Sequence, residues 1–491
     1  ALLLTDRSGG GGGRRGTAPD LAELLPQWLA AANAHGYRAP AEQLPALLDA
    51  ARARTDLRSP VLALGGPRAL WLARLNPDWR FALRGRTDRG PGLPAAGQDG
   101  RSGAAGTAAD AAGGADGTDR AAVRRLWEEG LFAERSALLV SLRRHDPAAA
   151  RELLAGTWPT ERAEDRLMFL DTLREGLSPD DEEFLEQALT DRSRTVRATA
   201  AELLSALPAS ALAARMAVRA RACVAPDHTG GAVRLAVEAP YECDAGMQRD
   251  GVAPRPPAGR GERSWWLSQV VEAAPLDTWA GHLGGRTPAE ITALPVADDW
   301  EQELHAAWAR AAVRQRDAAW ARALLGKPSA PMATVPGDPA KLLTVLPARE
   351  RAEWAAEFIA AHGLSEAFRV LGVCAVPWAE PLGRAVVDAL EIARDAGSYP
   401  WSFSGVMGLA ERCLDPAQAD RLAPLTAVPD EPEDGSPGAG GYWAEAFQRL
   451  VATLRLRATM LGELEPGRGP EEGPGEEGEG EGTAQAATDP T

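Results

Sequence analysis

Two cysteines, a histidine and an aspartate near the middle of the chain are the residues best suited to metal chemistry. Cys223, His228, Cys243 and Asp244 carry the thiolate, imidazole and carboxylate groups that bind zinc. Their spacing matches none of the usual zinc motifs. The chain has only four cysteines in 491 residues, which is too few for a disulfide framework, and a free cysteine is usually a small buried apolar residue. We therefore predict no metal site and no cofactor.

Other common catalytic patterns are also missing. There is no Gly-x-Ser-x-Gly motif, and the glycine run Gly9–Gly13 lacks the lysine of a phosphate-binding loop. The carboxylates of Asp180–Glu183 stand where a helix is expected to begin, so they fit a solvated first turn better than an acid/base pair. We predict no catalytic residue. One enzymatic hypothesis stays open, with a site around Cys243–Gly251.

The elements that must position these residues are predicted to be helices. The chain exceeds the ~250–300 residues that one hydrophobic core usually serves, so it needs several domains or a repeat array. Trp is frequent, with 15 residues, whereas Phe and Tyr number 8 and 4, and Ala and Leu dominate. This mixture favours helices over sheets. Only two lysines occur, Lys327 and Lys341, which we attribute to codon usage.

Charge separates the acidic end of the chain from the rest. The net charge is −16, and the segment Glu463–Thr491 holds nine acidic residues and one arginine, which is half of that charge. The remainder is still negative, which argues against general nucleic-acid binding. Neither a signal peptide nor an apolar run of ~20 residues is visible. We expect a cytoplasmic protein with no membrane segment.

Helix signals and low-complexity stretches divide the chain into seven parts. Asp146-Pro147 and Ser178-Pro179 place a capping residue before a proline, as helix starts do. The glycine-rich and acidic stretches cannot bury enough apolar surface to fold. The predicted parts are a flexible N-terminus (1–20), an N-terminal helical region (21–83), a disordered linker (84–118), HEAT-like helical repeats (119–226), a strand-bearing insert with a helix (227–297), C-terminal helical repeats (298–462) and a disordered acidic tail (463–491).

A junction between two helices gives the repeat type. Leu189–Leu204 resembles the helix-turn-helix junction of a HEAT repeat, with Asp191 in the turn and Val196-Arg197 opening the second helix. Asp317–Leu325 echoes the pattern of the helix after Asp146. The separations differ between such echoes, so the repeat is degenerate. The predicted fold is mostly α: a HEAT-like solenoid or helical repeat array.

The insert is the exception to this helical pattern. Val233, Leu235 and Val237 alternate with more polar residues, which predicts a short strand. Asp250-Gly251 is a turn signal of the hairpin type.

Several motifs together resemble an uncharacterised bacterial family of unknown function. They are Leu2–Arg7, Trp71 with Asn76-Pro77-Asp78-Trp79, Trp127 and Gly130 with Arg135, the helix from Asp146, Phe184–Arg197, and Glu242-Cys243-Asp244 with Arg249-Asp250-Gly251. Members are often encoded beside a SWIM zinc-finger protein, a MoxR-type AAA ATPase and a von Willebrand factor A protein. No activity is established for the family, so the resemblance implies an accessory role near such an ATPase and no catalytic residue.

The functional prediction is a non-enzymatic protein-interaction scaffold, because stacked helices form a concave binding surface. A MoxR-type AAA ATPase or a von Willebrand factor A protein is the expected partner. The alternative from another class is a HEAT-like nucleic-acid-binding or base-repair protein, although 119–221 holds 16 Arg against 18 acids. The residues predicted to contact a partner are Trp71, Asn76, Asp78, Trp79, Arg135, Asp191, Arg197, Asp244, Arg249 and Asp250.

Overall fold

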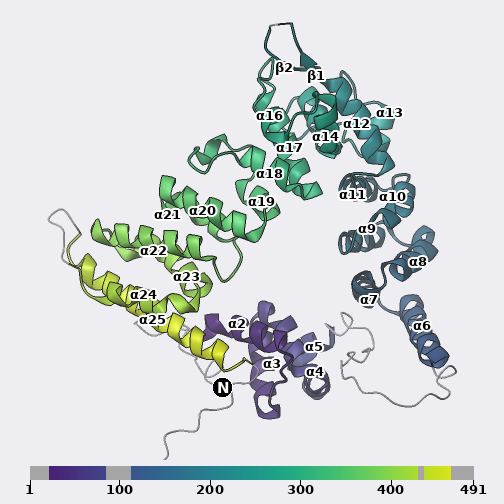
Figure 1. The fold of residues 1–491 in the computed structure, drawn as a ribbon. Helices are drawn as coiled ribbons and strands as arrows, with labels where there is room; N and C mark the ends of the chain where they lie inside the picture. The colour runs from purple at the N-terminus through teal and green to yellow at the C-terminus, as the bar shows by residue number, and fades with distance from the viewer. Residues whose placement is uncertain (1–20, 85–111, 230, 430–435, 466–491) are drawn as a thin grey trace, which may run out of the picture.

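The structure, a computed structural model, describes residues 21–84, 112–229, 231–429 and 436–465. These ranges are mostly helical, with one pair of short strands, which confirms the predicted mostly-α helical repeat fold (Figure 1). The predicted flexible N-terminus, most of the predicted linker and nearly all of the acidic tail lie outside the described residues.

The N-terminal helices have a hydrophobic core of their own. They are α2 (Leu21–Ala34), α3 (Leu44–Ala53), α4 (Arg58–Leu75) and α5 (Arg80–Arg84). Leu29, Leu48 and Val61 are fully buried between them. A kink divides α4 at Gly66, whose φ of 54° is a conformation that glycine adopts without strain, and Pro67 follows it.

The array then begins with helices whose starts follow the capping signals in the sequence. They are α6 (Ala112–Glu129), α7 (Phe132–His145), α8 (Pro147–Thr157), α9 (Ala163–Asp171), α10 (Glu182–Ala188), α11 (Arg194–Ser205) and α12 (Ala211–Cys223). The Asp146 carboxylate accepts from the amide of Ala149 at the start of α8, and Ser178 and Asp181 form a capping box before α10. Helix α6 begins inside the range predicted as linker.

The middle of the chain carries the strands. Strand β1 (Val224–Asp227) pairs antiparallel with β2 (Arg234–Val237), where the alternating residues predicted a strand. Short helices follow: α13 (Ala245–Arg249), α14 (Glu262–Ala273), α15 (Asp277–His282) and α16 (Pro288–Thr292). The prediction of a hairpin turn at Asp250-Gly251 is wrong. This dipeptide ends α13, where the Asp250 amide donates to Gly246 and Gly251 has a φ of 91°.

Helices fill the rest of the described chain. They are α17 (Glu301–Gln315), α18 (Ala318–Leu325), α19 (Pro339–Val345), α20 (Ala348–His362), α21 (Leu364–Leu371), α22 (Glu380–Asp395), α23 (Ser404–Cys413), α24 (Ala419–Leu422) and α25 (Ala439–Gly462). Asp317 caps α18 as Asp146 caps α8, so the echo between these two segments is also structural.

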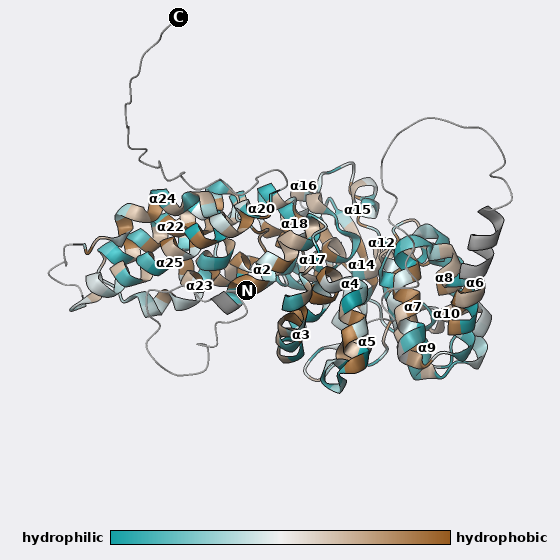
Figure 2. Cartoon of the chain, turned by 90° about the horizontal axis from the view of Figure 1, so that it is seen from below, coloured by the Kyte–Doolittle hydropathy of each residue, from teal (hydrophilic) through white to brown (hydrophobic). Residues whose placement is uncertain are grey.

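The helices of the array pack on helices close to them in the chain, often on the helix two positions along. Helix α9 contacts α7 and α11, and α19 contacts both α17 and α21. A single hydrophobic core runs from Trp127 to Leu454, through the strand-bearing part. In Figure 2 most helices carry both hydrophilic and hydrophobic residues, as amphipathic helices in an array do. The two predicted repeat regions therefore share one core.

The array curves back so that its last helix meets the N-terminal helices (Figure 1). Gln27 on α2 makes the link: its amide nitrogen donates to the carbonyl of Arg412, and its oxygen accepts from the Arg457 guanidinium, both at 2.9 Å. The Leu464 side chain, just after α25, packs into the N-terminal core. Segments more than 380 residues apart are thus held together.

Replacing Gln27 with alanine is expected to loosen this link. Arg457 is 2% exposed, so losing its acceptor leaves a buried N–H unpaired, which costs about 1–3 kcal/mol. Hydrogen–deuterium exchange should speed up along the contact between α2 and α25 and stay unchanged in α7–α11. Gln43→Ala is the control, because the structure shows no hydrogen bond between the Gln43 side chain and α25. Equal exchange in the two variants would contradict the link.

Candidate functional site

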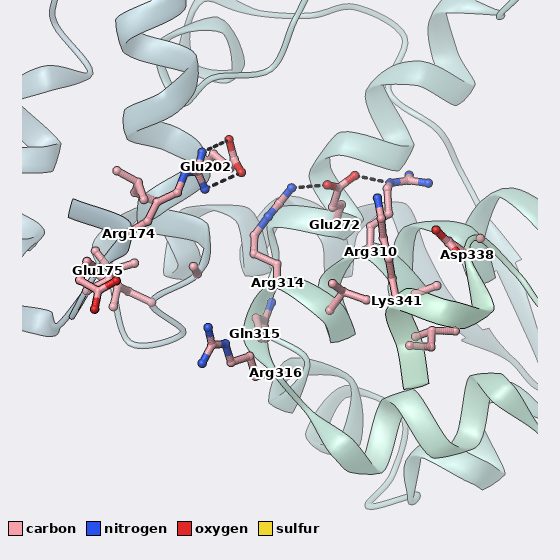
Figure 3. Close-up of a pocket in the computed structure, with 18 of the residues that line it drawn as sticks. Arg174, Glu175, Glu202, Glu272, Arg310, Arg314, Gln315, Arg316, Asp338 and Lys341 are labelled. Carbon is pink, nitrogen blue, oxygen red and sulfur yellow. Dashed lines mark hydrogen bonds and ion pairs between the residues drawn. The ribbon is translucent and has the colours of Figure 1, made fainter. Parts of the chain in front are cut away.

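A pocket of about 980 Å³ lies where the first helices of the array face the helices that follow the strands. Its walls come from α11, α14, α17 and α19 and from the turn after Thr172–Arg174 (Figure 3). The charged side chains that line it are Arg174, Glu175, Glu202, Glu272, Arg310, Arg314, Arg316, Asp338 and Lys341. The pocket is therefore a polar site assembled from distant parts of the sequence.

One wall is a charged cluster built on α17. Arg310 and Arg314 stand four residues apart, so they lie on the same face of the helix. Both pair with Glu272 of α14, one on each carboxylate oxygen, and the distance to Arg310 is 2.5 Å. Arg314 also donates to the Ser205 hydroxyl of α11 at 3.1 Å. These bonds fix both guanidinium groups before any ligand binds.

The facing wall carries a second, more exposed pair. The Arg174 guanidinium donates to both carboxylate oxygens of Glu202 at 2.9 Å each (Figure 3). These hydrogen bonds raise the pKa of Arg174, and burial opposes them less strongly. Arg174 is thus a permanent cation that already has a counterion.

Two cations at the pocket have no such counterion in the described part of the chain. Arg316 ends α17 in a left-handed conformation, with φ at 54°, and Lys341 lies on α19; both are exposed. Of the nearby acids, Glu175 has a basic partner outside the pocket, whereas Asp338 keeps its negative charge at the start of α19. Glu175 pairs with Arg144 at 3.4 Å, and the Asp338 carboxylate accepts from the amide of Ala340 at 3.1 Å. The lining therefore holds five cations against four carboxylates, which leaves an excess of one positive charge for an anionic group.

The residues predicted to contact a partner lie elsewhere. In the N-terminal helices, Trp79 is buried and its indole nitrogen donates to Asp49 at 2.9 Å. Asn76 accepts from the amide of Asp78, and Asp78 pairs with an arginine of α3. Trp71 alone in this group presents a large exposed side chain, 59% accessible.

The predicted residues of the first repeats bind one another or neighbouring helices. The Arg135 guanidinium stacks over Trp127 at 4.2 Å and pairs with Glu161. Asp191 pairs with an arginine of α9 at 2.8 Å, and its carbonyl accepts from Arg197 at 2.6 Å. These contacts hold the junction between α10 and α11.

The cluster around Asp250 is brought together, but as a buried ion-pair network. Asp250 is 2% exposed and pairs with Arg219 at 2.6 Å, with Arg215 at 2.8 Å and with Arg249 at 3.1 Å. Burial raises the pKa of Asp250, yet hydrogen bonds from Arg215 and Arg219 outweigh it, so the pKa lies below its ordinary value. Asp244 caps α13 by accepting from the amide of Met247.

The cysteines lie in surroundings that suppress reactivity. Burial raises the pKa of Cys223 to about 11 and also raises that of Cys243, so both thiols stay protonated near neutral pH. Within the described ranges, no group of three or more His, Cys, Asp or Glu side chains is placed to hold a metal ion.

The pocket residues were not among those predicted from the sequence. The available signals were the spacing of Arg310 and Arg314 and the rarity of lysine, and neither of them indicates which distant carboxylates and cations meet. The arginines of the pocket come from segments more than 100 residues apart, so only folding brings them together.

The fold defines a mostly-α helical repeat protein with a charged pocket between its repeats. Over residues 1–464 the chain matches the family described as "Family of unknown function (DUF5691)", and it belongs to that family. The predicted membership in an uncharacterised family is thereby confirmed. None of the curated proteins and none of the solved structures compared with the chain matches it.

Proposed function

We propose that the protein is a non-enzymatic interaction scaffold that binds a protein partner at the charged pocket. The observation that carries the proposal is the pair Arg316 and Lys341, cations with no acidic partner in the described part of the chain, beside arginines held in place by Glu272 and Glu202. The paired arginines are already fixed and lose little side-chain entropy on binding, whereas Arg316 and Lys341 contribute charge that is not yet paired. The array supplies the rigid frame, and the pocket supplies the specific contacts.

The repeat type and the accessory role are parts of the proposal that rest mainly on the sequence. The turn that holds Asp191 and Arg197 lies between α10 and α11, which supports a HEAT-like repeat type. The family resemblance supports a cytoplasmic accessory role beside a MoxR-type AAA ATPase or a von Willebrand factor A protein. Among the described residues, no helix has both the length and the apolar character needed to cross a lipid bilayer.

The nucleic-acid alternative is less well supported than protein binding. Many of the arginines between 119 and 221 have an acidic partner, which leaves little free positive charge for phosphates. Arg143 and Arg151 pair with Asp181, Arg166 pairs with Asp191, and Arg215 pairs with both Glu186 and Asp250. DNA binding requires cations that are free to displace counterions.

The enzymatic alternative near Cys243–Gly251 is also less well supported. The carboxylate of Asp250 is buried and paired with Arg215, Arg219 and Arg249, and its pKa lies below its ordinary value, so it is a poor base. This network fits a structural role that joins α12 to α13.

The test is a comparison of binding partners between pocket variants. In the double variant Arg316→Glu and Lys341→Glu, two cations become anions. Each charge-assisted hydrogen bond contributes about 1.5–3 kcal/mol, so partner affinity is expected to fall by at least about a hundredfold. The matched control is Lys327→Glu, at the other lysine, which is exposed and lies outside the pocket.

The measurement is an affinity pull-down from host lysate, with and without ATP, read by mass spectrometry. Proteins retained by the wild type and the control but lost by the double variant would support the pocket as the binding site. A AAA ATPase or von Willebrand factor A protein in that set would support the accessory role. If the wild type, the double variant and the control retained the same set of proteins, the proposal would be contradicted.

A further inference from the structure

We infer that in the free protein this pocket is occupied by the chain's own acidic C-terminal segment, residues 466–491, which a partner must displace. This inference rests on the proposed function of the pocket. The occupant is identified by its charge, by its tether and by the chemistry of its side chains.

The charges of the segment and the pocket are complementary. Residues 466–491 hold seven acidic residues and one arginine, and six of the acids are glutamates between 471 and 481. Among the described residues Arg316 and Lys341 of the pocket have no acidic partner, and beside them Arg310 and Arg314 share the single carboxylate of Glu272. The segment contains no aromatic or large aliphatic side chain, so its carboxylates are the groups by which it can be recognised.

The tether makes the contact intramolecular. Leu464 is buried in the N-terminal core, so the segment starts from a fixed point on the molecule. Fully extended, 26 residues span up to ~90 Å, about eight times the diameter of a helix. Because the array curves back on itself, the end of α25 is not at the far end of an extended rod (Figure 1). A tether of this length gives an effective concentration on the order of 1 mM.

The contact is expected to be weak and reversible. Ordering a segment rich in Glu, Gly and Pro costs conformational entropy, and its side chains bury little apolar surface to offset that cost. With a dissociation constant of about 0.1 mM for the segment itself, tethering lowers the affinity of a competing acidic ligand about tenfold. A partner must therefore carry more than a few carboxylates to displace the segment from the pocket.

The scarcity of lysine makes the contact directly measurable. A water-soluble carbodiimide joins a lysine amine to a carboxylate that touches it, and the chain has only Lys327 and Lys341. In the full-length protein, Lys341 should become linked to glutamates in 471–481 at least about ten times more often than Lys327, which is also exposed. The linked peptides are identified by mass spectrometry. Linkage of Lys341 only to neighbours such as Asp338, or equal linkage of the two lysines, would overturn the inference.

A second measurement separates this inference from the proposed function. The six glutamates between 471 and 481 are replaced by glutamine in the full chain, and binding of a labelled octaglutamate peptide is measured by fluorescence anisotropy. The glutamine variant should bind the peptide about tenfold more tightly than the wild type, and adding Arg316→Glu and Lys341→Glu should abolish binding. Equal affinities for wild type and glutamine variant would overturn the role of the segment alone. Failure of both to bind the peptide would count against the pocket as an acidic-ligand site.

Discussion

Replacing Asp181 with asparagine is expected to lower the free energy of unfolding of the array by about 3–5 kcal/mol. The Asp181 carboxylate receives two hydrogen bonds from Arg143, at 2.7 and 2.9 Å, and neither side chain is accessible to solvent. Arg151 adds a third at 3.0 Å. Asparagine keeps the shape and removes the charge, so the Arg143 guanidinium remains buried without its counterion.

The matched control for this variant is the preceding residue. Asp180→Asn changes an exposed carboxylate in the same turn, and surface substitutions of this kind usually stay within about 0.5 kcal/mol. Urea unfolding followed by circular dichroism compares the two variants at the same pH. A midpoint for Asp181→Asn equal to that of the control would show that the buried pair contributes nothing measurable.

The same buried pair also supports the pocket. Arg143 donates to the carbonyls of Glu175 and Gly176 at 2.9 and 2.8 Å, and both of these residues line the pocket. Gly176 has a φ of 62°, and a side chain there would approach the Arg143 carbonyl at 3.1 Å. The turn that forms one wall is therefore held by the core of the array.

Replacing Asp250 with asparagine is expected to cost about 2–4 kcal/mol at neutral pH, somewhat less than the loss at Asp181 because Arg215 and Arg219 keep partial access to water. The effect should depend on pH. The folded-state pKa of Asp250 lies below its unfolded value, so its stabilising contribution is present above pH ~4 and is lost as the pH falls through the folded-state pKa. The gap between wild type and variant should shrink accordingly in acid.

The measurement is the free energy of unfolding between pH 2.5 and 7 for both proteins. Glu242→Gln is the control, because Glu242 is an exposed carboxylate close to the same helix. A gap that stayed constant across this range would contradict the ionised, arginine-paired state of Asp250.

Local sequence rules predicted the repeat elements because their causes lie within a few residues. The carboxylates of Asp146 and Asp317 accept from amides two or three positions ahead, and before α10 the Asp181 carboxylate accepts from the Ser178 amide, so these caps mark helix starts. The alternation of apolar and polar residues around Leu235 predicted a strand, because this pattern also depends only on neighbouring residues. At Asp250-Gly251 the local signal fits either a hairpin turn or a helix end: in the structure the dipeptide ends α13, and arginines of α12 more than 30 residues earlier pair with the Asp250 carboxylate.

The candidate site and the curved closure of the array depend on long-range packing. Arg314 meets Ser205 across 109 residues, and Gln27 meets Arg457 across 430. Which face of each helix turns inward, and which distant carboxylate an arginine reaches, follows from how all the helices stack, and a degenerate repeat leaves that stacking unspecified in the sequence. Composition and local signals were therefore enough for the fold class, whereas the pocket, with two cations unpaired among the described residues, became visible only when the helices were placed side by side.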